Sequence, residues 1–434
     1  MDLDRLRERL IMATAFKQLE DEAIEVARSI AYSMPIEDID MTDSARFVDN
    51  THWAFFERLR KEAPVHYCAN GRFGPFWSVT RYKDIMAVDT NHAVFSSEAH
   101  LGGITAKDQD DDFILPMFIA MDQPKHDVQR KAVSPIVAPA NLAVLEVLIR
   151  ERAQKIFDNL PINEPFDWVD RVSIELTTQM LATLFDFPWE DRRKLTYWSD
   201  VTTIDVSAPD AKMTRDEQRA ILIECLTYFT ALWNARVNAP PAGDLISMMA
   251  HNPSMRDMQP MEYLGNLLLL IVGGNDTTRN SITGGLLFLN ENPGEYQKLR
   301  DNHALIESMV PEIVRYQTPL AHMRRTALHD TILGGQHIKK GDRVVMWYVS
   351  GNRDETEIEN ADAFIIDRAR PRQHLSFGFG IHRCVGNRLA EMQLKIVWEE
   401  ILKRWPMIEV IEPPVRVQSA FVKGYEQMIV RIPR

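Results

Sequence analysis

The stretch from Phe377 to Gly386 constrains this chain more than any other part of its sequence. It reads Phe-Gly-Phe-Gly-Ile-His-Arg-Cys-Val-Gly, so Cys384 follows a turn broken by glycines and precedes a long helical pattern. A cysteine at a helix start faces unpaired backbone N–H groups and the positive end of the helix dipole, and both favour a thiolate. Glycines such as Gly378 and Gly386 permit unusual backbone angles and the close approach of a flat ligand. The pattern favours a thiolate metal ligand, although a lone cysteine is more commonly a buried structural residue.

The spacing Phe-Gly-x-Gly-x-His-Arg-Cys-x-Gly resembles the haem-binding loop of the cytochrome P450 family, the haem-thiolate monooxygenases. The resemblance covers nearly the whole chain from about residue 40. It implies a mainly α-helical, single-domain fold with a small β region, haem b (iron protoporphyrin IX) as cofactor and Cys384 as the ligand of the iron. We therefore expect a haem-thiolate monooxygenase domain over residues 41–434 and an N-terminal helical extension over residues 1–40.

Composition narrows the class of protein further. The chain has 434 residues, of which 45% are hydrophobic, so it can bury a large core, and no linker or repeat divides it. A formal net charge of −12 argues against nucleic acid as a general partner. There is no signal peptide, and no run approaches the roughly 20 apolar residues that span a bilayer. The cysteines Cys68, Cys225 and Cys384 are an odd, sparse set, which is typical of a reducing cytoplasm.

Helical periodicity dominates the chain, and strand signals are fewer. A hairpin is expected where Val65–Tyr67 and Phe76–Val79 flank a turn, with further short strands over 331–349 and 408–433. The polar segments 98–112 and 202–214 are expected to be loops. The family resemblance implies that they act as lids, and plain surface loops are the alternative. Helices are expected over 51–62, 82–89, 124–135, 141–158, 170–185, 216–237, 261–289, 305–317 and 385–404.

A second motif lies inside the expected helix 261–289. An apolar run is followed by Gly273, Gly274, Asn275, Asp276 and Thr277. Two glycines within a helix cost about 1 kcal/mol each relative to alanine, so they indicate a place where the helix opens or something approaches its backbone. The Thr277 hydroxyl can bond to the Gly273 carbonyl, four residues earlier. An inert helix with tight glycine packing is the alternative. The segment resembles the family's oxygen-activation motif, which implies that Asp276 and Thr277 deliver protons.

Three further patterns match the family. Glu312 and Arg315 resemble its E-x-x-R pair, which implies a structural lock with no catalytic role. Gln393 stands where many relatives have glutamate.

Each cationic residue near these motifs, considered alone, is expected to be a surface charge. Their positions, however, match the places that bind the haem propionates in the family. The resemblance implies this role for His126, Arg130, Arg325 and His382, with Arg324 as the alternative to Arg325.

Redox partners are also expected. The chain contains no flavin or iron–sulfur module and no dinucleotide-binding loop, so the resemblance implies electrons from a ferredoxin and an NAD(P)H-dependent ferredoxin reductase. A basic cluster around the cysteine loop is a candidate dock for an acidic ferredoxin, and a solvated surface is the alternative. Its residues are Lys131, Arg372, Arg383, Arg388 and Lys395.

The substrate prediction depends on subfamily-like motifs around Gly273–Ser281 and His322–Ala327, which resemble those of bacterial terminal hydroxylases of alkanes and fatty acids. Related enzymes that act on steroid side chains share much of the first motif, so such lipids are the alternative. A haem-binding sensor without turnover is the alternative of another class, and the presence of both Asp276 and Thr277 argues against it. We expect the substrate pocket to include Ile119, Leu269, Gly273, Gly274, Leu320, Met323 and Phe421.

Overall fold

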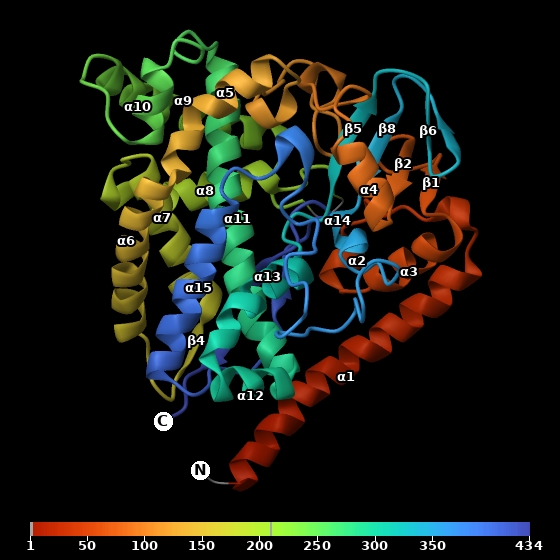
Figure 1. The fold of residues 1–434 in the computed structure, drawn as a ribbon, viewed down its shortest axis with the longest axis vertical. Helices are drawn as coiled ribbons and strands as arrows, with labels where there is room; N and C mark the ends of the chain where they lie inside the picture. Colours follow the sequence, from red (N-terminus) through yellow and green to blue (C-terminus); the bar gives the residue numbers. More distant parts are fainter. Residues whose placement is uncertain (1–2, 209–210) are drawn as a thin grey trace.

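A long helix, α11 (Pro260–Glu291), runs through the middle of the molecule, and most other helices pack around it (Figure 1). It contacts α7, α8, α9, α13 and α15 on different sides. Its residues between Tyr263 and Asn290 are largely buried, both the apolar runs toward its two ends and most of the polar run over Asn275–Ser281 between them. The predicted mainly α-helical fold with a small β region is confirmed.

The computed structural model describes residues 3–208 and 211–434, with side chains from residue 17 onward. The helices are α1 (Leu3–Ser33), α2 (Ala45–Val48), α3 (His52–Glu62), α4 (Tyr82–Asp89), α5 (Lys125–Val133), α6 (Pro139–Asp158), α7 (Glu175–Leu184), α8 (Arg193–Thr203), α9 (Arg215–Val237), α10 (Leu245–His251), α11 (Pro260–Glu291), α12 (Pro293–Asp301), α13 (Ile306–Gln317), α14 (Tyr348–Gly351) and α15 (Asn387–Arg404). A π-helical turn over Val169–Ile174 precedes α7.

The main sheet lies to one side of the helical body (Figure 1) and has the strand order β1-β2-β8-β5-β3. The predicted hairpin is confirmed, since β1 and β2 pair antiparallel with Val65 opposite Val79. Strand β2 runs parallel to β8, and the other neighbours in this sheet are antiparallel. The strands are β1 (Val65–Cys68), β2 (Phe76–Val79), β3 (Phe95–Ser96), β4 (Pro165–Asp167), β5 (Met323–Ala327), β6 (Thr331–Leu333), β7 (Gln336–Ile338), β8 (Arg343–Met346), β9 (Glu409–Val410), β10 (Val415–Arg416), β11 (Tyr425–Gln427) and β12 (Ile429–Arg431).

The expected helices are present within a few residues of their predicted ends. Helix α9 starts where the sequence provides a capping box, with the Thr214 hydroxyl accepting from the Glu217 amide and the Glu217 carboxylate bonded back to Thr214. Helices α2, α8, α10, α12 and α14 were not predicted. Helix α8 is rich in residues of modest helix propensity, and the burial of Leu195, Trp198 and Val201 under it stabilises the helix instead.

Helix α1 crosses the outside of the molecule and contacts α3 (Figure 1). Ion pairs join it to the body, with Arg28 beside Glu57 at 3.0 Å and Arg416 beside Glu20 at 2.5 Å. Among the described residues, no single helix is both long and apolar enough to cross a membrane. One bent pair, Lys125–Val137 with Pro139–Asp158, passes that test on length and composition alone.

The buried Glu312–Arg315 pair forms the lock that the sequence predicted. Glu312 accepts from Arg315 at 2.7 and 2.8 Å and from Arg368 at 3.0 Å, and neither Glu312 nor Arg315 has any exposed side-chain surface. Arg315 also donates to the carbonyls of Asn352, Ala361 and Ala363. These bonds fix α13 to the segment that leads toward the cysteine loop.

We expect Glu312→Ala to destabilise the protein strongly, because it leaves Arg315 and Arg368 buried without a counter-charge. Breaking a buried pair in this way costs about 3–5 kcal/mol. Urea unfolding followed by circular dichroism should show a clearly lower midpoint. Lys83→Ala, which removes an exposed partner of Glu357, is the control and should leave the midpoint unchanged. Equal midpoints for the two variants would show that the network does not stabilise the fold.

Candidate active site

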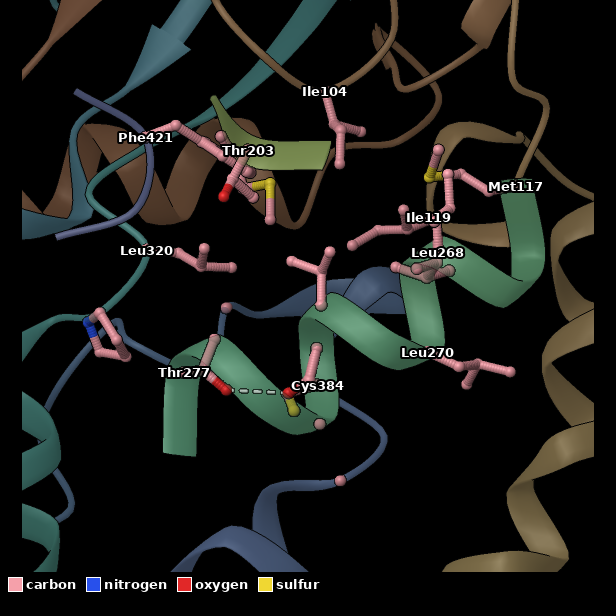
Figure 2. Close-up of a pocket in the computed structure, with 18 of the residues that line it drawn as sticks. Ile104, Met117, Ile119, Thr203, Leu268, Leu270, Thr277, Leu320, Cys384 and Phe421 are labelled. Carbon is pink, nitrogen blue, oxygen red and sulfur yellow. Dashed lines mark hydrogen bonds between the residues drawn. The ribbon is translucent and has the colours of Figure 1, made fainter. Parts of the chain in front are cut away.

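A large internal cavity of about 490 Å³ lies between α11 and the loop that carries Cys384. Figure 2 shows Thr277 on α11 close to Cys384 at one end of this cavity. Leu320, Ile119 and Leu268 lie around the space next to them, and apolar side chains continue to the far end. The cavity is therefore a mainly apolar chamber with a thiol and a hydroxyl at one end.

The cysteine loop is held in shape by backbone bonds and by glycine. The Cys384 amide donates to the Phe377 carbonyl at 2.8 Å, and α15 begins three residues after the cysteine, at Asn387. Gly380 has a positive φ of 65°, and a Cβ there would lie 2.5 Å from the Asp89 carbonyl oxygen. Only glycine meets both requirements, so this position fixes the turn that presents the thiol.

Cys384 differs from the other two cysteines in its surroundings. Cys68 and Cys225 are buried in packed protein, whereas the accessible surface of Cys384 faces the internal cavity that it lines. Burial inside the molecule raises the pKa of the Cys384 thiol, and the amides of Gly386 and Asn387 act against this rise, as does Arg130. The groups at the helix start thus act in the direction that the sequence predicted, but in the protein alone burial has the larger effect on this pKa.

The four cationic residues that the sequence grouped around the cofactor all line the cavity. The rings of His126 and His382 are 4.3 Å apart, Arg130 donates to the Arg383 carbonyl at 2.5 Å, and Arg325 pairs with Asp89 at 2.9 Å. Burial lowers the pKa of His126 and lowers that of His382 to about 2.

Arg324, the alternative to Arg325, does not reach the cavity. Adjacent residues in a strand face opposite sides, and Arg324 pairs instead with Asp108 at 2.6 Å. The structure therefore places Arg325, and not Arg324, beside the other three cationic residues.

The predicted hydrogen bond within α11 is confirmed, because the Thr277 hydroxyl donates to the Gly273 carbonyl at 2.8 Å. A Cβ at Gly273 would meet no atom within 4 Å, whereas one at Gly274 would lie 2.8 Å from a methyl of Leu181. Gly273 therefore leaves open space beside Thr277, and Gly274 allows close packing on α7.

Asp276 is placed differently from Thr277. It does not line the cavity and is fully buried on another side of α11, where its Oδ1 lies 3.0 Å from Arg279 and accepts from Asn275 at 3.1 Å. Arg279 also pairs with Asp200 on α8 at 2.6 Å. Burial raises the pKa of Asp276 to about 6, against the opposing effect of Arg279. Oδ2 of Asp276 has no hydrogen-bond partner among the described residues.

Every residue predicted for the substrate pocket lines this cavity, and Gly378 and Gly386 line it too. The sequence missed residues that fold onto the cavity from distant segments. Ile104 and Thr203 come from the two segments expected to be lids, and Leu181 and Leu245 come from α7 and α10. The sequence had marked the segments of Ile104 and Thr203 as lids, but no signal distinguishes Leu181 and Leu245 from ordinary core residues, because their position depends on tertiary packing.

Comparison with known proteins agrees with this fold and site. The family model for cytochrome P450 matches residues 238–422. The chain is 35% identical over 391 residues to linalool 8-monooxygenase from Pseudomonas putida, covering 87% of this chain and 95% of that protein. It is 31% identical over 413 residues to methyl-branched lipid omega-hydroxylase from Mycobacterium bovis, covering 91% and 95%. The structure of cytochrome P450-153 from Novosphingobium aromaticivorans superimposes with a TM-score of 0.85 and 45% identity, covering 91% of this chain and 99% of that one.

The chain therefore belongs to the cytochrome P450 family and is a P450 monooxygenase. The family implies a haem whose iron is bound by a cysteine thiolate, and electrons supplied by redox partners. The residues present fit such a group. Nε2 of His126 and Nδ1 of His382 are buried without a hydrogen-bond partner among the described residues. Such atoms are costly unless a ligand satisfies them, and the haem propionates are suitable acceptors.

The raised pKa of Asp276 gives a pH-dependent prediction. The folded state binds this proton more tightly than the unfolded state, so the contribution of Asp276 to stability is most favourable at low pH. It is lost as pH rises from about 4 toward 6, by about 3 kcal/mol in total. We expect Asp276→Asn to remove this loss, so that urea stability of the variant relative to wild type improves over that interval. A constant difference from pH 4 to pH 7 would contradict the raised pKa.

Proposed function

We propose that this P450 hydroxylates the terminal methyl group of a straight-chain alkane or fatty acid. The observation that carries the proposal is the apolar chamber that leads to Thr277 and Cys384 (Figure 2). A chain of methylene groups can replace water along such walls at a gain of about 0.8 kcal/mol per buried CH₂. The similarity to an enzyme named as a lipid omega-hydroxylase supports the same class of substrate.

The cofactor in this proposal is haem b, with Cys384 as the ligand of its iron. Arg130 and Arg325 are assigned to the two propionates as charged donors, and His126 and His382 as ring N–H donors, since all four line the cavity and lie at or beside the cysteine loop. When bound, the haem supplies the oxidising chemistry that inserts one oxygen atom from O₂ into a C–H bond.

Thr277 and Asp276 are assigned to proton transfer. Thr277 holds its hydroxyl at the cavity wall, anchored on the Gly273 carbonyl. Asp276 sits behind it on the same helix, and its pKa of about 6 lets it gain and lose a proton near neutral pH. Arg279 and Asp200 continue from Asp276 toward the surface, where Asp200 is 45% exposed. In this arrangement, protons move between solvent and the Thr277 hydroxyl through the α8–α11 contact.

Selectivity for a terminal methyl requires positioning, because terminal C–H bonds are stronger than internal ones. A tenfold preference corresponds to only about 1.4 kcal/mol between the competing transition states. Walls that admit the end of a chain and hold it in line can supply this difference. Leu320 and Ile119 lie on either side of the space beside Thr277 (Figure 2), so they are the walls assigned to this role.

The redox partners in this proposal are a ferredoxin and an NAD(P)H-dependent ferredoxin reductase, and the compartment is the cytoplasm. The docking surface is the basic cluster around the cysteine loop. Two of its members are already neutralised, because Arg372 pairs with Glu391 and Lys395 with Glu307. Lys131, Arg383 and Arg388 are exposed and form no ion pair with other described residues, so they are the members best able to attract an acidic partner.

Replacing Cys384 with alanine tests the assignment of the metal ligand. We expect the Cys384→Ala variant to lose the red-shifted Soret band of the ferrous carbonyl complex, because that band requires a thiolate on the iron. Cys225→Ala, a change in a buried cysteine away from the cavity, should keep the band. A variant at Cys384 that retained it would require another ligand.

Product mapping tests the proposed reaction. With octane and dodecanoic acid, we expect mainly terminal alcohols from the wild-type enzyme with its redox partners. Leu320→Ala widens the space beside Thr277 and should shift the product toward subterminal alcohols by a factor of about 3–10, equivalent to about 1 kcal/mol of lost positioning. Mass spectrometry of the alcohols measures both. Mainly internal alcohols from the wild type would overturn the proposal.

A further inference from the structure

Residues of the two polar segments line the end of the cavity away from Cys384, within 104–109 in the first segment and within 202–205 in the second. Ile104 and Thr203, one from each segment, lie at this end in Figure 2. The segments are joined directly, because the Lys107 amine donates to the Ser207 hydroxyl at 2.9 Å. Lys107 itself is half-buried and lines the cavity. A cationic side chain is therefore built into the wall at the end opposite the thiol.

Lys107 differs from the arginines around this end of the cavity, which form ion pairs. Among residues 3–208 and 211–434, no carboxylate lies within ion-pairing distance of Lys107, and its partner is the uncharged Ser207. The neighbouring arginines all have acidic partners. These pairs are Arg72 with Asp205 at 2.7 Å, Arg215 with Asp110 at 3.0 Å, Arg219 with Asp110 at 2.9 Å and with Asp112 at 2.6 Å, and Arg324 with Asp108 at 2.6 Å.

The described side chains place no negative charge in contact with the Lys107 amine. Burial lowers the pKa of Lys107, and nearby Arg215 and Arg72 act in the same direction, while Asp205 and Asp110 raise the pKa. Asp205 also lines the cavity, but its carboxylate is already bound by Arg72. An anion placed against the amine would restore charge balance at this position.

We propose that Lys107 binds the carboxylate of a straight-chain fatty acid whose terminal methyl reaches the space beside Thr277 and Cys384. This inference rests on the proposed function and narrows its substrate class from alkanes and fatty acids to fatty acids. The chain lies along the apolar wall, which includes Ile119 and Leu268, and the head group lies at the polar end. Binding the head group at one end fixes which carbon arrives at the other.

The donor set at this end matches a carboxylate better than a phosphate. One lysine supplies a single positive charge, and its amine keeps two hydrogens to donate after it gives one to the exposed Ser207 hydroxyl. Thr202 and Thr203 lie nearby but donate to carbonyls of their own helix. A doubly charged phosphate would need more cationic donors than this end of the cavity offers.

The test compares two ligands that differ only in head group. Dissociation constants for dodecanoic acid and dodecan-1-ol are measured by calorimetry on the holoenzyme at about pH 8, where the acid is ionised. Lys107→Met keeps the length of the side chain without the charge, and Lys107→Arg keeps the charge. Lys212→Met is the matched control, because Lys212 lies in segment 202–214, pairs with Glu426 and is 78% exposed outside the cavity lining.

We expect Lys107→Met to weaken dodecanoate binding by about fivefold or more, as for loss of a partly buried charge pair. Dodecan-1-ol should change by less than about twofold, Lys107→Arg should restore most of the dodecanoate affinity, and Lys212→Met should have no effect. An unchanged dodecanoate affinity in Lys107→Met, or an equal loss for both ligands, would overturn the role of Lys107. The position of oxidation is measured separately on wild type, so failure of terminal hydroxylation remains distinguishable from failure of head-group binding.

Discussion

The buried carboxylate of Asp89 holds the active-site half of the molecule together. It accepts from the Phe379 amide at 2.7 Å, from the Tyr348 hydroxyl at 3.0 Å and from Arg325 at 2.9 Å. These donors come from the cysteine loop, from α14 and from strand β5, so one side chain at the end of α4 fixes three elements. Burial raises the pKa of Asp89, but its three donors favour the ionised form.

Local patterns in the sequence predicted the cysteine loop and the defect in α11, because each depends on residues close together in the chain, whereas the lock at Glu312 followed from the family resemblance. The hydrogen bond from Thr277 to the Gly273 carbonyl is of this kind, since helical spacing alone brings the two groups together. The mainly helical fold with a small sheet followed from the family that these motifs identify. The boundary between the expected N-terminal extension and the main domain stays a prediction.

The side of a helix or strand that a residue faces, and the packing of segments distant in the chain, could not be predicted in the same way. The sequence left Arg324 and Arg325 as alternatives, and the pairing of β5 with β8 decides which one faces the cavity. In the sequence, Asp276 is next to Thr277. Consecutive residues on a helix point in directions about 100° apart. Asp276 therefore faces α8, while Thr277 faces the cavity. Asp89 carried no signal at all, because its partners lie more than 200 residues away.

Helix α8 contacts both the cavity wall far from Cys384 and the buried Arg279 beside Asp276. Its last residues, including Thr203, form part of the cavity wall far from Cys384, and Asp200 one turn earlier neutralises Arg279 beside Asp276. A displacement of α8 would therefore move part of the cavity wall together with Asp200, and would change the electrostatic potential at the buried Asp276 carboxylate. The shape of this end of the cavity and the potential at Asp276 are thus coupled through a single turn of helix.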